Sequence, residues 1–251
     1  MSESTSTIIN SIDIQNIASF YDFSLNQEEE KYLEFHAKRL AYFVNITKKY
    51  TKLVSTKKDK AIKILDIGPH FLTFALHKYI ENNMTLNTLG WENRLAPSNI
   101  INHHLKFDLN YAQHQEKWLS AEAHDIVIMC EVIEHLYTAP EIVLSFLKTF
   151  ISPGGFLIIG TPNAAYLPNR ILLALGKNPY ERIRKTYDNP GHFREYTASE
   201  FKEICQEVGL TCKSIEYHDF SEKKGIAHKI VGLMGNIHQP FKKYLSVVCQ
   251  N

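Results

Sequence analysis

Two carboxylates and an imidazole follow one another closely in the stretch Cys130–Leu136. Glu131, Glu134 and His135 have the spacing i, i+3, i+4, so one helical turn would carry all three to the same side. The apolar run Asp125–Cys130 before them predicts a buried strand whose carboxyl end would aim these side chains into a crevice. Such a set suits a divalent cation or general base chemistry. A structural role, in which Glu131 holds the turn and His135 packs, is the third interpretation.

A second candidate histidine, His192, lies in the turn PGHFREYT. It precedes Thr197 and Glu200, whose types and spacing predict a capping box and therefore the start of a helix. For His192 at this position, a role in the functional site and a purely structural role are equally supported. An ion pair between the adjacent Arg194 and Glu195 that orders the loop is a further interpretation of the same turn.

The residues that would hold a nucleotide-like ligand begin in the stretch Ala61–Tyr79. Its pattern predicts a buried strand, a tight turn at Gly68-Pro69, and a helix from Phe71. Such a unit places backbone N–H groups and a helix N-terminus at the carboxyl end of a strand. Open α/β sheets bind nucleotide-like ligands at that place.

Two further acidic residues follow predicted strands. Glu92 ends the predicted strand Thr85–Trp91, 26 residues after Asp66. A carboxylate at that point can accept hydrogen bonds from both ribose hydroxyls of a nucleoside. Asp108 follows a weaker predicted strand, Ile101–Phe107.

The sequence ILDIG resembles the first motif of class I S-adenosylmethionine (SAM) dependent methyltransferases, which usually read hhDhGxGxG. Gly68 fills the first glycine position, while His70 and Leu72 stand at the other two. The segment SPGG at 152–155 is similar to the LkPGG segment that precedes strand five in the same family. The resemblance implies that SAM is the cofactor, held by Asp66, Gly68, Glu92, Asp108 and Glu131.

Two other motifs carry resemblances to branches of this family. EVIEHL resembles O-methyltransferases of quinone biosynthesis and small-RNA 3′-terminal 2′-O-methyltransferases, where ExxEH is associated with a divalent metal. The resemblance leaves a divalent metal open as a second cofactor, and no metal ligands are assigned. HFREYT resembles the HxREYT element of methyltransferases that modify glycans and lipids. The position of His192 also corresponds to the place where the small-RNA methyltransferases have another metal-binding histidine.

The predicted fold is α/β, a Rossmann-like, seven-stranded, doubly wound sheet with its last strand antiparallel. Residues 1–60 would form an N-terminal arm and a cap helix, with the helix over Asn26–Tyr50. Residues 61–251 would form the SAM-binding methyltransferase domain, with a turn at 152–155 before its fifth strand, Phe156–Gly160. An insertion after that strand, 163–195, is interpreted as a lid over the acceptor.

The predicted lid is rich in basic residues. Six Lys or Arg side chains stand against three acidic ones in this segment, which favours an acceptor with a phosphate or carboxylate group. A solvated basic surface is the competing interpretation. Within the lid, Ile171–Leu175 is predicted to be buried against the core, with contact to a lipid-like acceptor as the alternative.

Bulk composition narrows the partners and the location. The chain has 251 residues and a net charge of +1, which does not favour a nucleic acid as partner. The sequence lacks a signal-peptide pattern and any apolar stretch long enough to span a membrane, and its four cysteines form no CxxC pair. These features predict a cytoplasmic protein; the oligomeric state is not predicted.

The resemblance, together with the basic lid, implies methyl transfer to oxygen in a small acceptor that is polar, anionic or sugar-containing. The catalytic candidates are His135, Glu131, Glu134 and His192, of which His135 would orient or deprotonate the acceptor. The N-methylation signature (D/N)PP(Y/F) is absent after the fourth predicted strand. Two alternatives stay open: a metal-assisted RNA 2′-O-methyltransferase, and a degenerate methyltransferase fold that only binds.

Overall fold

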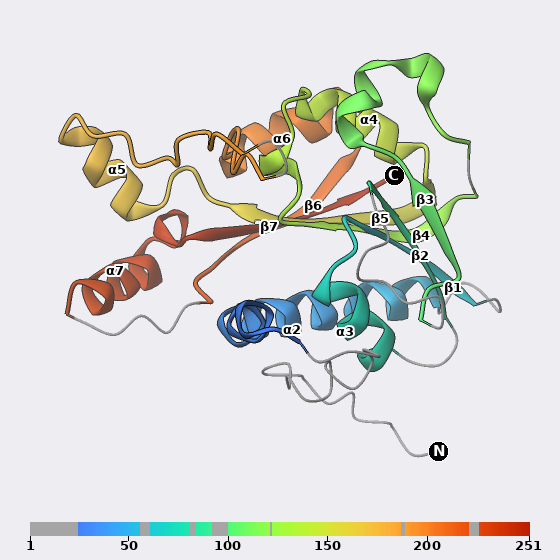
Figure 1. Cartoon of the computed structure of the whole chain (residues 1–251), viewed down its shortest axis with the longest axis horizontal. Helices are drawn as coiled ribbons and strands as arrows, with labels where there is room; N and C mark the ends of the chain where they lie inside the picture. Colours follow the sequence, from blue (N-terminus) through green and yellow to red (C-terminus); the bar gives the residue numbers. More distant parts are fainter. Residues whose placement is uncertain are drawn as a thin grey trace.

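A seven-stranded sheet with the strand order β3-β2-β1-β4-β5-β7-β6 forms the centre of the protein (Figure 1). The computed structural model describes residues 25–55, 61–80, 84–91, 100–120, 122–186, 189–220 and 226–251, with only the backbone of 226–228. The predicted N-terminal arm before residue 25 lies outside the described residues. All neighbouring strands pair in parallel except β7, which is antiparallel to both β5 and β6. The predicted Rossmann-like sheet with an antiparallel last strand is confirmed. The strands are β1 (Ile62–Ile67), β2 (Met84–Gly90), β3 (His103–Lys106), β4 (His124–Cys130), β5 (Ile151–Pro162), β6 (Thr211–His218) and β7 (Tyr244–Gln250).

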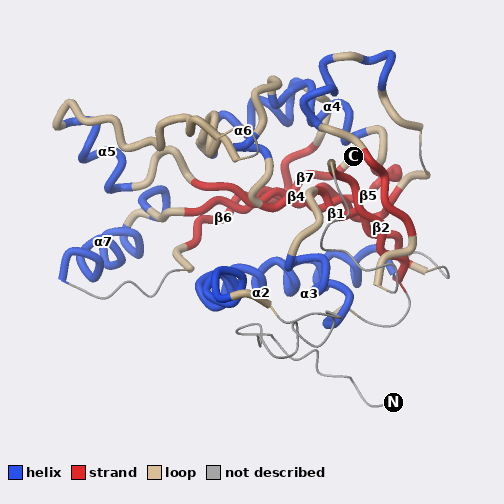
Figure 2. The backbone as a smooth tube through the Cα atoms, viewed as in Figure 1, coloured by secondary structure: helices blue, strands red, loops and turns tan. Residues whose placement is uncertain are grey.

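Helices cover both faces of the sheet, and each face has its own apolar core (Figure 2). On one face lie α2 and α3, and on the other lie α4, α6 and the short helix η1. Because β1, β4 and β5 are buried on both faces, their sequences are apolar without alternation. The helices are α2 (Gln27–Ser55), α3 (Phe71–Tyr79), η1 (Leu109–Gln113), η2 (Gln115–Lys117), η3 (Ile133–His135), α4 (Pro140–Lys148), α5 (Leu167–Ala174), α6 (Ala198–Glu207), α7 (Ile226–Ile237) and η4 (Gln239–Phe241).

The long helix α2 brings the N-terminal part of the chain onto the sheet. Asn26 caps it, because its side-chain oxygen accepts hydrogen bonds from the N–H groups of Glu28 and Glu29. Phe43 is buried directly over Gly160 of β5, where an added Cβ would lie 2.2 Å from the ring. Glycine at this position therefore lets the helix approach the sheet closely. The predicted helix is confirmed and continues five residues beyond Tyr50.

Strand β5 begins earlier than predicted. The segment 152–155, predicted as a turn, lies within β5, where the register with β4 shifts between His124 and Ile126. The four residues form an irregular, bulged part of the strand rather than a separate connection.

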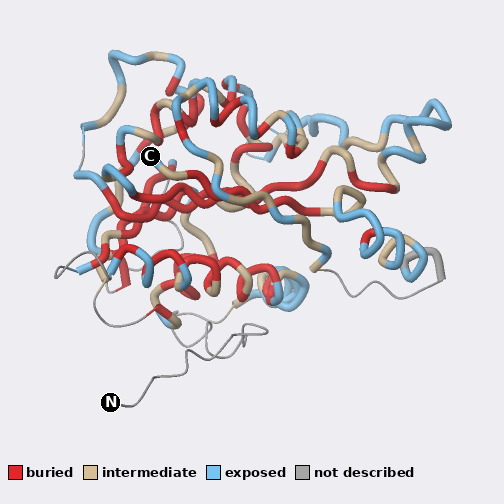
Figure 3. The backbone as a smooth tube through the Cα atoms, turned by 180° about the vertical axis from the view of Figure 1, so that it is seen from behind, coloured by how far each residue is buried: buried red, intermediate tan, exposed pale blue. Residues whose placement is uncertain are grey.

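The insertion that follows β5 leaves and rejoins the domain at one place. Asn163 and Tyr196 form an isolated bridge at its two ends, and α5 lies between them. The prediction that Ile171–Leu175 is buried is wrong, because Ile171, Leu173 and Leu175 are at least 49% exposed. The physical reason is visible in Figures 1 and 3, where α5 stands beyond the end of the sheet with no sheet face to cover it. None of the helices in the described part of the chain is both long and apolar enough to cross a membrane.

The contact between Phe43 and Gly160 makes a prediction about stability. A Gly160→Ala variant is expected to lose about 1–3 kcal/mol of unfolding free energy, because the buried ring cannot move away without disturbing the core. The measurement is urea denaturation followed by circular dichroism.

Gly232→Ala is the matched control for this substitution. Gly232 lies in α7, and an added Cβ there meets nothing within 4 Å among the described residues. Alanine should therefore leave stability unchanged or raise it by about 0.5–1 kcal/mol. A Gly160→Ala variant as stable as this control would show that α2 does not pack as closely as described.

Candidate active site

A cavity of about 450 Å³ lies at the carboxyl ends of β1, β2 and β4, the place where α/β sheets bind nucleotides. It is called the first cavity below. Gly68 lies in its wall with φ at +71°, a conformation that favours glycine. An added Cβ at Gly68 would also lie 2.7 Å from Cγ2 of Val132. The first glycine of the motif is therefore required by both the backbone and the packing.

The two other glycine positions of the motif place no such demand on the backbone. His70 has an extended conformation with φ at −154°, and Leu72 lies in the first turn of α3. Both side chains line the first cavity, and the His70 ring lies 5.1 Å from that of Tyr32 on α2. Burial, with the nearby Arg39, lowers the pKa of His70 to about 4, so its ring is neutral at pH 7. The tight turn at Gly68 is therefore preserved, and the His70 and Leu72 side chains occupy space in the first cavity that glycines would leave open.

Asp66 ends β1 beneath the same cavity. Its carboxylate accepts a hydrogen bond of 2.6 Å from the Thr73 hydroxyl, which itself accepts one from the N–H of His70. Burial raises the pKa of Asp66 to about 7, and the bond from Thr73 only partly offsets this. Asp66 therefore couples the end of the strand to the start of α3.

An arginine that sequence reasoning missed lies between α2 and β4. Arg39 is 4% exposed, and its Nη1 donates to Oε2 of Glu131 over 2.6 Å while its Nη2 donates to the hydroxyl of Tyr32. Burial raises the pKa of Glu131, and the Arg39 guanidinium only partly counteracts this. The signal in the sequence was the position of Arg39 four residues before Phe43, on the apolar stripe of the helix.

The ion pair leaves two buried polar atoms unpaired. Nε of Arg39 and Oε1 of Glu131 have no hydrogen-bond partner among the residues that the structure describes. Both residues line the first cavity. Glu131 also has φ at +55°, the only non-glycine residue with positive φ in the described part of the chain. These features mark the end of β4 as a place built to meet a ligand.

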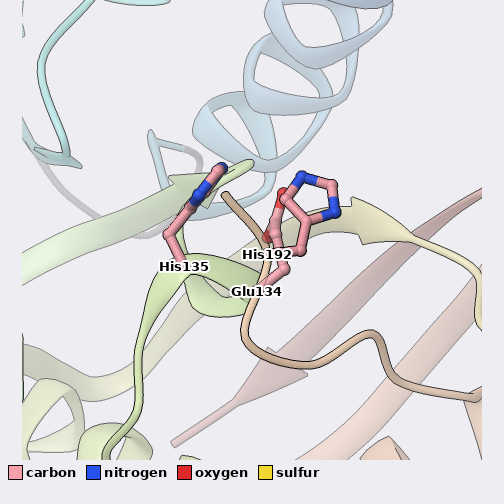
Figure 4. A group of neighbouring side chains, drawn as sticks. All are labelled: Glu134, His135 and His192. Carbon is pink, nitrogen blue, oxygen red and sulfur yellow. The ribbon is translucent and has the colours of Figure 1, made fainter. Parts of the chain in front are cut away.

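The next residues along the chain form a cluster with His192. Ligand atoms of Glu134, His135 and His192 all lie within 4.8 Å of one another, and Figure 4 shows the two rings rising on the same side of the ribbon. Glu134 is fully buried, with Oε2 accepting from the Thr161 hydroxyl and Oε1 unpaired among the described residues. Its backbone oxygen accepts from the N–H of Phe193, which ties the two parts of the cluster together. Burial and the neighbouring Glu131 raise the pKa of Glu134.

The hydrogen bonds of the two histidines fix which ring nitrogen is free. Nδ1 of His135 lies 3.0 Å from the carbonyl oxygen of Gly191, which can only accept, so Nδ1 carries the proton and Nε2 keeps a lone pair. Nδ1 of His192 lies 3.2 Å from Glu195 and donates to that carboxylate, while its Nε2 has no hydrogen-bond partner among the described residues. Burial and the nearby His192 lower the pKa of His135, so it is neutral at pH 7.

These contacts change two details of the sequence interpretation. Arg194 pairs with Glu200, at the start of α6, rather than with Glu195, so the predicted ion pair of neighbours is wrong. The predicted capping box is present and places Glu200 within reach, since its carboxylate also accepts from the Thr197 N–H. The predicted group of Glu131, Glu134 and His135 is also divided in the structure. Glu131 forms an ion pair with Arg39, whereas Glu134 and His135 lie beside His192.

A second cavity, of about 570 Å³, adjoins the first. Tyr32, Arg39, Glu131 and His135 line both cavities and form the boundary between them. The rest of its wall comes largely from the insertion after β5 and from the start of β7. Its polar members include Asn163, Asn169, Glu181, Arg184, His192, Glu195, Lys243 and Tyr244.

The remaining predicted cofactor residues lie apart from the first cavity or outside the described residues. Asp108 lines a third cavity, of about 580 Å³, which shares Trp91, His135 and Pro190 with the first. Its carboxylate accepts from the N–H of Asn110 and caps η1. Glu92 lies outside the described residues. Cys130, which was not a candidate, lines the first cavity, and burial raises the pKa of its thiol.

Residues 32–215 of the chain match the model of a family described as methyltransferase domain. A probable S-adenosylmethionine-dependent methyltransferase of Mycolicibacterium smegmatis is 30% identical over 105 residues, which cover 42% of this chain and 35% of that protein. The match thus spans about a third of the length of that curated relative.

Two solved structures have the same fold. A SAM-dependent methyltransferase from Archaeoglobus fulgidus aligns with a TM-score of 0.50 at 14% identity, over 90% of this chain and 100% of that one. The CurJ carbon methyltransferase aligns with a TM-score of 0.52 at 16% identity, over 84% of this chain and 55% of that one. At such low identity these two structures show the fold alone.

The raised pKa of Asp66 predicts how stability depends on pH. The folded carboxyl has a pKa of about 7 and keeps its proton up to that pH, whereas the unfolded one loses it near the ordinary pKa of 3.8. Between these values the folded state binds more protons, so stability falls as pH rises. From pH 5 to pH 8 the wild type should lose on the order of 2–3 kcal/mol more than an Asp66→Asn variant, which cannot ionise.

Urea denaturation at several pH values measures this difference. A Glu116→Gln variant, which changes an exposed carboxylate, is the control and should follow the wild type. Parallel pH curves for the wild type and Asp66→Asn would contradict the assigned pKa.

Proposed function

Because the chain belongs to the methyltransferase domain family and is a SAM-dependent methyltransferase, we propose that it methylates a hydroxyl oxygen of a small polar acceptor. The observation that carries this proposal is the boundary between the two cavities. Arg39, Glu131 and His135 belong to the walls of both, so a donor in one and an acceptor in the other would meet at these residues. Methyl transfer is an in-line displacement, which depends on such alignment.

The first cavity is the proposed site of SAM, which supplies an electrophilic methyl group on its sulfonium. Gly68 lets the chain turn closely at the end of β1, and Asp66 holds that turn through Thr73. The unpaired atoms of Arg39 and Glu131 offer a donor and an acceptor to a polar ligand in the cavity. Glu92 and Asp108 remain proposed cofactor residues, of which Asp108 would act from the adjoining third cavity.

His135 is the proposed general base. Its Nε2 keeps a lone pair, its ring is neutral at pH 7, and it lines both cavities. It can therefore accept the proton that the acceptor hydroxyl loses during transfer. The Gly191 carbonyl would then stabilise the orientation of the ring. Glu134 and His192 are proposed to position this base and the acceptor, and Glu131 to hold the boundary through Arg39.

The composition of the second cavity favours a small anionic or sugar-containing acceptor. Arg184 and Lys243 can attract a carboxylate or phosphate group, while the amides of Asn163 and Asn169 lie in the same wall. The insertion that supplies most of this wall is the proposed acceptor lid. A cavity of about 570 Å³ has the size that binds small molecules.

A metal-assisted 2′-O-methyltransferase acting on RNA is the second candidate, and the cluster of Glu134, His135 and His192 favours it. Glu134 has an unpaired buried oxygen, and both histidines have free Nε2 atoms, so the donor set fits a divalent cation. A cation held there would supply positive charge beside the reacting oxygen. The proposed metal ligands are Glu134, His135 and His192, whereas Glu131 forms an ion pair with Arg39.

The proposed base is tested by a His135→Gln variant. Methyl transfer from labelled SAM is measured with a panel of hydroxyl acids, sugar phosphates and free sugars. We expect the variant to reduce turnover by about 10²–10⁴-fold, because the proton acceptor is lost. Its affinity for S-adenosylhomocysteine, measured by calorimetry, should stay within a few-fold of the wild type.

The control is His103→Gln, which makes the same change at an exposed histidine of β3 that is not among the residues lining the three cavities, and it should keep wild-type turnover. Unreduced turnover in His135→Gln would exclude His135 as the base. Absence of S-adenosylhomocysteine binding in the wild type would instead support the alternative of a fold that has lost catalysis.

The metal candidate is tested by chelation and metal analysis. If a cation is required, activity on a 3′-terminal RNA should be lost in chelator and restored by Mg²⁺ or Mn²⁺. His192→Ala should then lose bound metal in elemental analysis while still binding S-adenosylhomocysteine. Full activity in chelator would exclude this candidate and leave the metal-free base mechanism.

A further inference from the structure

Helices α5 and α7 stand together beyond one end of the sheet (Figures 1 and 3). The side chain of Asn163 donates to the carbonyl oxygens of Pro240 and Lys242, which joins the start of the insertion to the segment after α7. The Arg170 guanidinium also lies 5.3 Å from the centre of the Phe241 ring. The two helices therefore form one surface, although they come from distant parts of the sequence.

This surface exposes many large aliphatic side chains. It carries six of the fifteen large hydrophobic residues that are exposed in the described part of the chain, and Ile237 is 80% exposed. Isolated exposed apolar residues are ordinary, but a cluster marks a surface that binds something. The residues, which together define the α5/α7 face, are Ile171, Leu175, Ile230, Leu233, Met234 and Ile237.

The same segments carry a concentrated positive charge. Segments 164–186 and 226–243 contain eight Lys and Arg residues and one acidic residue, Glu181, in a chain whose net charge is only +1. Glu181 is itself paired with Arg184. The helix α7 contains no acidic residue at all. Arg184, Lys185 and Lys243 line the second and third cavities, whereas Arg170, Lys177, Lys229 and Lys242 lie on or next to α5, α7 and η4. Positive charge outside the cavities therefore occurs on the same helices as the exposed aliphatic side chains.

We propose that the α5/α7 face docks on an anionic lipid bilayer. Basic side chains near such a surface are attracted to acidic headgroups, while aliphatic side chains of a helix lying in the interface enter the acyl boundary. Both components are present here on helices that no sheet face covers. The inference does not depend on which acceptor the enzyme methylates.

Charge is also the reason for preferring a bilayer to a second copy of the chain. A symmetric dimer through this face would bring the basic segments of two copies together, and like charges at an interface oppose association. An anionic surface instead complements them.

Vesicle sedimentation with the full chain tests the proposal. The wild type should sediment with phosphatidylcholine vesicles that contain phosphatidylglycerol, not with pure phosphatidylcholine, and salt should weaken binding. A double variant, Lys229→Glu with Ile237→Glu, should lower the vesicle affinity on the order of tenfold or more. Both residues are exposed, so the fold should be preserved.

The matched control makes the same two changes on α2, Lys52→Glu with Leu53→Glu, at exposed positions away from the α5/α7 face. It should bind vesicles as the wild type does. Equal loss in both double variants, or no binding of the wild type to anionic vesicles, would overturn the proposal. A wild-type dimer in light scattering that Lys229→Glu with Ile237→Glu dissociates, without vesicle binding, would assign the face to a second copy.

Discussion

The ion pair between Arg39 and Glu131 is the constraint on which the site depends. It joins residues 92 positions apart and connects the first long helix to the end of β4. A buried ion pair contributes little net stability by itself, but removing one partner would leave an unpaired charge inside the protein. The pair thus fixes the place where α2 meets the sheet. It also restrains Glu131 in its left-handed conformation.

The geometry of the following turn depends on that restraint. The Glu131 side chain points to α2, and the chain then continues into η3. The side chains of Glu134 and His135 on η3 lie close to His192 instead. The backbone oxygen of Glu134 then ties the loop before α6 through the N–H groups of Phe193 and Arg194. One turn therefore divides the acidic motif between two tasks. Glu131 forms part of the boundary between the first and second cavities, and Glu134 and His135 belong to the cluster with His192.

Much of the fold could be predicted from the sequence, because it depends on local patterns. The buried strands show continuous apolar runs, and the capping box is recognisable from the types and spacing of Thr197 and Glu200. Arg39 was missed because its partner is distant in the chain. Likewise, the apolar segment 171–175 was predicted to be buried, although apolar content alone does not show whether a sheet face is available to cover it. The backbone conformations at His70 and Leu72 also needed the structure, because a motif does not state which of its glycines the turn requires.

The buried thiol of Cys130 has a consequence for the chemistry of the protein itself. A sulfonium is an alkylating agent, and a thiolate is among the strongest nucleophiles that a protein contains. Cys130 lines the first cavity, so with SAM bound there, as proposed, an ionised sulfur would compete with the acceptor for the methyl group and become irreversibly methylated. Because burial raises its pKa, the thiol stays protonated at neutral pH and unreactive. The burial of Cys130 in the cavity wall would thereby protect the protein from alkylation by the proposed cofactor.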